Sequence, residues 1–225
     1  RGGVAGDFTV TKLNEEHFFI VGSGMAERYH VRFFEMVPCP KSVSFKSLTE
    51  EMCGFNVAGP KSRELLSRMT QDDLSTESWK FMRSRSITIA GIDAIAIRVS
   101  FTGDLGWEIY VKTENQLKLY EALLETGADL GVKPVGGRSF LSLRVEKGYG
   151  SWGRENSPEY WPQEAGLDRL IKLDKPSFLG KEAYLKIKDQ NPREKLVVLE
   201  VNADRNADPA GGEPVFLRDG TPVGR

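Results

Sequence analysis

The sequence has little of several features that would indicate a class of function. Its formal net charge is only −1, from 31 basic and 32 acidic residues, so the overall charge gives no reason to expect nucleic-acid binding. The two cysteines and two histidines are too few and too scattered for a disulfide framework or a zinc site. We therefore expect no nucleic-acid partner, no metal, and free thiols in a reducing compartment.

Long apolar runs are also absent. No stretch approaches the roughly 18 consecutive apolar residues of a membrane span, and no basic and then apolar leader opens the chain. We therefore expect no membrane association. The sequence lacks an initiator methionine, starts within a turn that enters a strand, and stops soon after a hairpin turn. We expect both ends to be cut from a longer polypeptide.

The composition of the 225 residues, 40% apolar and 28% charged, is typical of a globular protein that needs no disulfide or metal to fold. Alternating apolar and polar residues indicate a hairpin around residues 14–16, and later runs indicate further strands. Three-to-four-residue apolar spacing indicates helices. The expected strands are residues 8–13, 17–21, 53–59, 81–89, 94–99, 107–111, 196–201 and 214–219, and the expected helices are 25–34, 60–68, 113–127, 138–147 and 180–190.

The helix at 113–127 is expected to open with a capping box at Thr113 and Gln116. Its apolar side is expected to carry Leu117, Tyr120 and Leu124. The order of elements predicts an α+β fold, with antiparallel sheets covered by packed helices. The change to strands near the end predicts the start of a small β-barrel domain.

Residues 18–29, FFIVGSGMAERY, imitate a dinucleotide-binding turn, with a strand followed by Gly-x-Gly and a helix. The third glycine of that motif would fall at Glu27, and no acidic residue closes a parallel unit at the required distance of about 20 residues. We therefore expect neither a flavin nor a nicotinamide site in this chain.

Four stretches in one order carry a resemblance to a known family: RGGVAGDFTV, FNVAGPKSRELL, FTGDLGWEIYV and GGRSFLSLRVEKGY. Together they resemble the glycine-cleavage T-protein family of aminomethyltransferases over nearly the whole chain. The stretch YGSWGR and the residues after it resemble the folate-binding C-terminal region of dimethylglycine and sarcosine dehydrogenases. The resemblance implies a T-protein-like fold, with a folate-binding region at 1–165 and a linker helix and start of a β domain at 166–225.

The resemblance places the family's essential carboxylate at Asp7. Without the resemblance, Asp7 would be interpreted as a solvated aspartate at a strand end. Many T-proteins carry a second aspartate at the position of Gly6, so Asp7 is the only candidate here. A carboxylate within hydrogen-bond reach of a folate amine can orient that amine and take its proton, and we expect Asp7 to be catalytic in this way.

The same resemblance implies a folate site made by further residues. Glu108 matches the glutamate that accepts two N–H groups of the pterin ring. Apolar and polar residues alternate around it, so Glu108 also fits the polar face of an ordinary strand. Phe101 and Ser23 stand where T-proteins often have tyrosine and asparagine.

Arg138 matches a family arginine whose planar guanidinium can hold folate oxygens. Arg144, further along the same predicted helix, is expected to be structural. Trp152, with Tyr160 and Trp161, is a candidate for an aromatic wall of the cavity.

The function implied is one-carbon transfer in an FAD-dependent dimethylglycine or sarcosine dehydrogenase. A flavin domain of the same polypeptide, absent from this chain, would oxidise an N-methyl amine to an iminium, and tetrahydrofolate would capture the methylene as 5,10-methylenetetrahydrofolate. The alternatives are a free-standing aminomethyltransferase served by a lipoyl carrier protein and a folate-binding protein without catalysis. The expected location is the cytoplasm for a bacterial protein and the mitochondrial matrix for a eukaryotic one.

Overall fold

The computed structural model describes residues 2–204 and 211–225, and these form two compact units. One unit comprises residues 6–153, and the other combines the residues up to 5 with those from 154 onward. The predicted division into domains at residue 165 rests on motifs and stays a prediction. No helix within the described ranges is long and apolar enough to cross a membrane.

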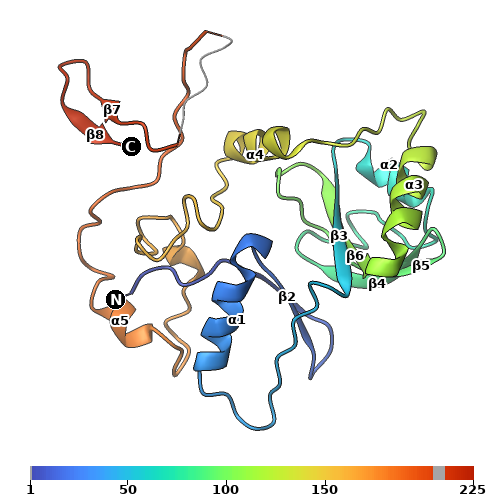
Figure 1. Cartoon of the computed structure of the whole chain (residues 1–225), viewed down its shortest axis with the longest axis horizontal. Coiled ribbons are helices and arrows are strands. Elements are labelled where there is room, and N and C mark those ends of the chain that lie inside the picture. The colour runs from blue at the N-terminus through green and yellow to red at the C-terminus, as the bar shows by residue number, and fades with distance from the viewer. Residues whose placement is uncertain (1, 205–210) are drawn as a thin grey trace. The chain divides into compact units, whose positions relative to one another are not determined.

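The larger unit is organised by a four-stranded antiparallel sheet with the order β3-β6-β5-β4 (Figure 1). The predicted hairpin between the runs 81–89 and 94–99 is confirmed, but its turn is shorter than expected, at Ala90 and Gly91. Ala90 has a φ of 51° and Gly91 of 72°, which suits a two-residue hairpin turn. The strands are β3 Met52–Ala58, β4 Ser84–Ile89, β5 Ile92–Ile97 and β6 Gly106–Lys112.

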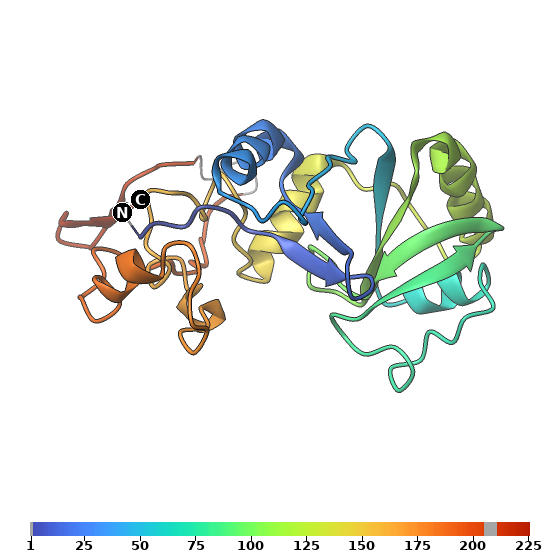
Figure 2. The same cartoon turned by 90° about the horizontal axis from the view of Figure 1, so that it is seen from below.

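Helices α2 (Ser62–Ser67) and α3 (Gln116–Thr126) lie beside this sheet (Figures 1 and 2). Trp107, Ile109 and Val111 alternate along β6 into the core beneath these helices, each no more than 1% exposed. Side chains alternate across a strand, so Glu108 and Tyr110 emerge on the opposite face of the sheet. One face of β6 therefore supports the core, while the other is available for a site.

Two details predicted for α3 are wrong. Leu117 and Tyr120 are exposed, whereas Leu119 and Leu123 face the core. The helix is apolar around much of its circumference, so periodicity alone did not select the face that the sheet covers. The predicted capping box is replaced by a 3-10 turn, Thr113–Asn115, and the Thr113 hydroxyl donates to the Glu50 carbonyl at 3.2 Å.

The predicted opening hairpin is confirmed by the antiparallel pair β1 (Thr9–Lys12) and β2 (Phe18–Val21). A 3-10 turn, Gly24–Ala26, then leads into α1 (Glu27–Met36). The helix predicted from residue 138 is α4 (Gly137–Glu146). It ends just before Gly148, whose φ of 68° is a conformation that glycine adopts without strain.

The smaller unit has less regular structure than predicted. A 3-10 turn at Asp168–Leu170 precedes helix α5. The helix covers only Lys181–Leu185 of the predicted 180–190, and the chain continues in turns after Leu185. Among the residues that the structure describes, 196–201 form no strand, although their composition favours one. The only strands described in this unit are the short pair β7 (Val215–Phe216) and β8 (Pro222–Gly224).

An ion pair between a buried glutamate and an exposed arginine joins two segments of the smaller unit. Glu164 is 2% exposed, and its two carboxylate oxygens accept hydrogen bonds from Arg193 Nε at 2.8 Å and Nη2 at 2.6 Å. The backbone N–H groups of Trp161 and Arg193 also donate to this carboxylate. The Arg193 guanidinium lies 4.9 Å from the centre of the Trp161 ring. These bonds hold the pKa of Glu164 down to about 2, chiefly through the Arg193 side chain.

Candidate functional site

A cavity of about 530 Å³ lies in the larger unit, on the side of the sheet to which Glu108 points. This volume is within the range of small-molecule sites. The β1–β2 hairpin, strands β3 and β6, helix α4 and the residues that follow α4 all contribute to its lining. The residues around it include Asp7, Ser23, Phe101, Glu108 and Trp152, so five of the six predicted site residues line one cavity.

Glu108 is joined to Tyr110 on the same face of β6. The Tyr110 hydroxyl donates a hydrogen bond of 2.6 Å to Glu108 Oε2. Burial raises the pKa of Glu108, and the hydrogen bond from Tyr110 partly offsets this increase. Burial and the neighbouring Glu108 carboxylate also raise the pKa of Tyr110, so the phenol stays protonated and remains a donor.

The ring of Tyr110 is fixed by neighbours from two other strands. Gly54 of β3 stands directly opposite Tyr110 in the ladder, and a Cβ at position 54 would lie only 2.8 Å from Tyr110 Cε1. From β2, the ring of Phe19 meets Tyr110 edge-on, with 5.1 Å between ring centres. The glycine therefore makes room for the phenol, and the hairpin packs against it.

Asp7 is placed at the cavity by the packing of the residue that follows it. The ring of Phe8 lies so close to Gly6 and Gly22 that a Cβ at either position would come within 2.7 Å of it. Phe8 also meets His30 of α1 edge-on, with ring centres 4.6 Å apart. These contacts anchor the chain at the start of β1, where Asp7 lies exposed at the rim of the cavity.

An aromatic cluster supports one wall of the cavity. Trp152 lies 4.9 Å from His30 and 5.9 Å from Tyr29 between ring centres. His30 is only 3% exposed, and burial lowers its pKa. Trp152 therefore reaches the cavity from an aromatic cluster, whereas Tyr160 and Trp161 belong to the other compact unit.

Helix α4 contributes to the cavity through Phe140, which stacks on Phe101 with ring centres 4.9 Å apart. Arg138, two residues earlier on the helix, is exposed and is not among the residues that line the cavity. Arg144 is 2% exposed and donates from Nη1 to the Tyr149 carbonyl, as expected for an arginine that packs within the structure.

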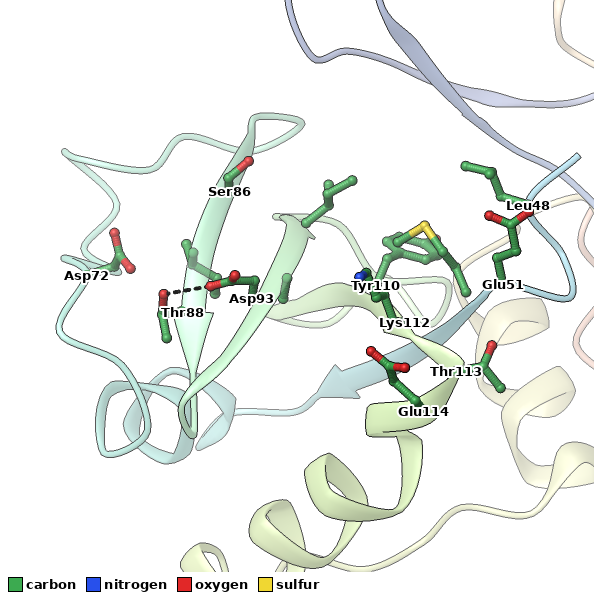
Figure 3. Close-up of a pocket in the computed structure, with 14 residues that line it drawn as sticks. Leu48, Glu51, Asp72, Ser86, Thr88, Asp93, Tyr110, Lys112, Thr113 and Glu114 are labelled. Atoms are coloured by element: carbon green, nitrogen blue, oxygen red, sulfur yellow. Dashed lines mark hydrogen bonds between the residues drawn. The ribbon is translucent and has the colours of Figure 1, made fainter. Parts of the chain in front are cut away.

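A second hollow of about 870 Å³ lies along β4, β5 and β6, over the face of the sheet that carries Tyr110 (Figure 3). Its labelled side chains include the acids Glu51, Asp72, Asp93 and Glu114, and the Thr88 hydroxyl donates to Asp93 at 3.3 Å. Tyr110 lines both hollows. No group of three or more potential metal ligands occurs in residues 2–204 and 211–225.

Sequence reasoning missed several residues of the first cavity, among them Gly54, Asn56, Tyr110 and Phe140. One signal for Tyr110 was present, because residues two apart on a strand share a face. The pairing of Asn56 with Glu108 across β3 and β6 depends on a strand register that the sequence alone did not provide.

Comparison with known proteins identifies the family. Residues 1–175 match the model of the GCVT N-terminal domain. The chain is 34% identical over 219 residues to the mitochondrial dimethylglycine dehydrogenase of Homo sapiens, covering 96% of the chain and 25% of that protein. It is 35% identical to the 4-methylaminobutanoate oxidase (formaldehyde-forming) of Paenarthrobacter nicotinovorans, covering 100% of the chain and 27% of that protein.

A free-standing relative is also similar. The aminomethyltransferase of Thermoanaerobacter sp. (strain X514) is 33% identical, over 89% of this chain and 54% of its own length. The crystal structure of the glycine cleavage system aminomethyltransferase T from Bartonella henselae superposes with a TM-score of 0.76 at 22% identity, over 99% of this chain and 59% of that one. This likeness confirms the predicted fold.

The chain thus spans about a quarter of the two oxidising relatives and about half of the aminomethyltransferase. The family match covers more than half of the chain, and it agrees with the fold and with the four motifs of the sequence. The chain belongs to the GCVT N-terminal domain family and is an aminomethyltransferase-type enzyme domain, related both to dimethylglycine dehydrogenase and to the free-standing aminomethyltransferases.

Proposed function

We propose that this chain is the tetrahydrofolate-binding, one-carbon transfer region of an FAD-dependent enzyme of the dimethylglycine or sarcosine dehydrogenase type. The observation that carries the proposal is the single cavity lined by both Asp7 and Glu108. The cavity combines aromatic walls with few acidic groups, as expected for a flat, polar-edged ligand. The identity to dimethylglycine dehydrogenase over 96% of the chain favours the oxidising branch of the family.

The residues of the cavity fit a pterin ring. Glu108, partly buried and held by Tyr110, presents carboxylate oxygens that can accept the ring N–H and the exocyclic amine together. Phe101, stacked on Phe140, and Trp152 offer flat apolar surfaces to the ring. Ser23 offers one hydroxyl at the end of the hairpin. Arg138 lies on the helix that carries Phe140, where it would hold folate oxygens beyond the ring.

Asp7 acts on the folate amine in this proposal. Tetrahydrofolate, when bound, supplies the two amine nitrogens that take up the one-carbon unit. Asp7 orients the attacking amine toward the methylene of an iminium and accepts its proton. The carboxylate then returns the proton to the departing amine nitrogen, and the second folate nitrogen closes the ring on the methylene with loss of its own proton to solvent, so that Asp7 is regenerated and the product is 5,10-methylenetetrahydrofolate. The N-methyl amine, such as dimethylglycine or sarcosine, is oxidised elsewhere, in a flavin domain of the same polypeptide.

The test separates binding from transfer. Anaerobic titration calorimetry with tetrahydrofolate is expected to show binding by the chain, with affinity reduced about tenfold or more in Glu108→Gln, because a hydrogen bond to a charged group is worth roughly 1.5–3 kcal/mol. Asp7→Asn is expected to bind tetrahydrofolate but to lose methylene transfer from an iminium formed by formaldehyde and a secondary amine.

Matched controls are available on the other hollow of the same unit, where Glu114→Gln and Asp93→Asn change the same functional groups outside the cavity. If Asp7→Asn retains full transfer, the catalytic role is wrong. Binding without transfer in the wild type would favour a folate-binding protein without catalysis. Transfer only from a lipoyl carrier would favour a free-standing aminomethyltransferase.

A further inference from the structure

The pair formed by Glu108 and Tyr110 carries an inference that rests on the proposed function and deepens it. We propose that Tyr110 is a positioning residue that holds the Glu108 carboxylate ionised and in one orientation for the paired N–H groups of the pterin. The resemblance of the sequence to the T-protein family assigned no role to Tyr110.

The hydrogen bond leaves enough acceptor capacity for the ligand. An ionised carboxylate has about four lone-pair positions, and the Tyr110 hydroxyl uses one of them, on Oε2. Three remain for the two N–H groups of a pterin. Because the phenol is held in the protonated form by burial and by the adjacent carboxylate, it can only donate to the charged Glu108 and so stabilises its acceptor form.

The geometry is built by three strands. Tyr110 follows Glu108 by two residues on β6, so both side chains emerge on the same face. Gly54 on β3 leaves the space that the phenol ring occupies, and Phe19 on β2 packs against the edge of that ring. The ring cannot swing toward β2, where Phe19 stands, and the bond of 2.6 Å has the length usual for a hydroxyl that donates to a carboxylate.

The need for such a partner follows from burial. Burial raises the pKa of Glu108, and among the causes of its shift only the Tyr110 hydrogen bond opposes this. A neutral carboxylic acid would present one O–H donor in place of an acceptor, and it would not accept two pterin N–H groups. Removing the phenol oxygen is therefore expected to raise the pKa of Glu108 further and to weaken folate binding first at low pH.

The central variant is Tyr110→Phe, which removes one oxygen and keeps the ring that contacts Gly54 and Phe19. Tyr120→Phe removes the same atom from an exposed position on α3 and is the matched control. Gly54→Ala is a second variant, which displaces the ring while retaining its hydroxyl. Thermal melts of all variants establish that each is folded.

Two readouts are measured on the chain. The first is the titration of the Glu108 carboxyl without ligand, by 13C NMR of carboxyl-labelled glutamate, with the signal assigned by its loss in Glu108→Gln. The second is the Kd for tetrahydrofolate between pH 6 and pH 8. The other titratable groups that line the cavity, Asp7 and Tyr149, are unchanged in every variant, as is Lys112, two residues after Tyr110 on β6, so a difference between profiles reports Glu108.

In Tyr110→Phe and Gly54→Ala we expect the Glu108 titration to move to higher pH and the Kd at pH 6 to weaken about tenfold, the effect of one charge-assisted hydrogen bond, with a smaller loss at pH 8. Tyr120→Phe is expected to match the wild type in both readouts. An unchanged Glu108 titration in Tyr110→Phe overturns the positioning role, even if folate binds. A shifted titration in a chain that does not bind tetrahydrofolate supports the effect of Tyr110 on Glu108, but it refutes the proposed function and the pterin as the ligand of this pair.

Discussion

The ion pair between the buried Glu164 and Arg193 in the smaller unit gives a quantitative prediction for Glu164→Gln. Lowering the pKa of Glu164 from 4.5 to about 2, at about 1.36 kcal/mol per pKa unit, sets an upper bound of about 3 kcal/mol on the stability that the charged form contributes. The Arg193 side chain is 54% exposed, and solvent screening reduces this contribution. The glutamine side chain of this variant keeps one of the two acceptor oxygens of Glu164. We therefore expect the free energy of unfolding to fall by about 1–2 kcal/mol at pH 7.

The pH dependence has a definite sign. The pKa of Glu164 is lower in the folded state, so its contribution is complete above the unfolded value near 4.5 and declines as the pH falls from there toward about 2. The difference in unfolding free energy between wild type and Glu164→Gln should therefore be constant from pH 7 to about pH 5.5 and shrink by pH 3.5.

The assay is urea denaturation followed by the fluorescence of the tryptophans, which include Trp161 beneath Arg193. Glu182→Gln, an exposed position on α5, is the control and is expected to change stability by less than about 0.5 kcal/mol. A difference below about 0.5 kcal/mol for Glu164→Gln at pH 7, or one that does not shrink in acid, would refute the reasoning.

Three further predictions concern the larger unit. Leu119→Ala is expected to cost about 2–5 kcal/mol in denaturant unfolding because Leu119 is fully buried against the sheet, whereas Leu117→Ala, at a position 65% exposed, should cost under about 1 kcal/mol; equal losses would contradict the observed helix face. His30 sits among the rings of Phe8, Tyr29 and Trp152, and burial lowers its pKa, so the unfolded chain takes up the proton first and stability should fall as the pH drops below about 6.5. His30→Phe should lose less stability than the wild type between pH 7.5 and pH 5.5, and an identical loss in both would exclude His30 as the cause. Gly148→Ala places a side chain at a φ of 68° and is expected to lower stability by about 1 kcal/mol, measured by thermal unfolding; an unchanged midpoint would show that the turn after α4 is not strained.

Much of the larger unit could be predicted from local patterns. The opening hairpin, the strands of the sheet and helix α4 follow from alternation, turn residues and a stopping glycine. The buried face of α3 could not be predicted in the same way, because apolar residues surround the helix and only the sheet decides that Leu119 and Leu123 are covered. The run at 196–201 has strand-forming composition, yet its residues form no strand in the part of the chain that the structure describes.

The candidate site was predictable to the extent that it depends on motifs. Asp7 and Glu108 were singled out from the sequence, and they line one cavity although 101 positions separate them. Their roles stay predictions, as does the role of Arg138. The contribution of Gly54 depends on which residue of β3 stands opposite Tyr110, and the pairing of Glu164 with Arg193 joins positions 29 apart. Neither long-range relation leaves a local pattern.

The odd-numbered and even-numbered residues of strand β6 face opposite sides of the sheet. Trp107, Ile109 and Val111 serve the interior, and Glu108 and Tyr110 serve the cavity. The lining of the cavity can therefore be altered at the even positions while the hydrophobic packing at the odd positions is left intact. An insertion of one residue at the start of this strand would exchange its two faces. Glu108 would then point into the interior and Trp107 into the cavity, so both the core packing and the lining of the cavity would be lost.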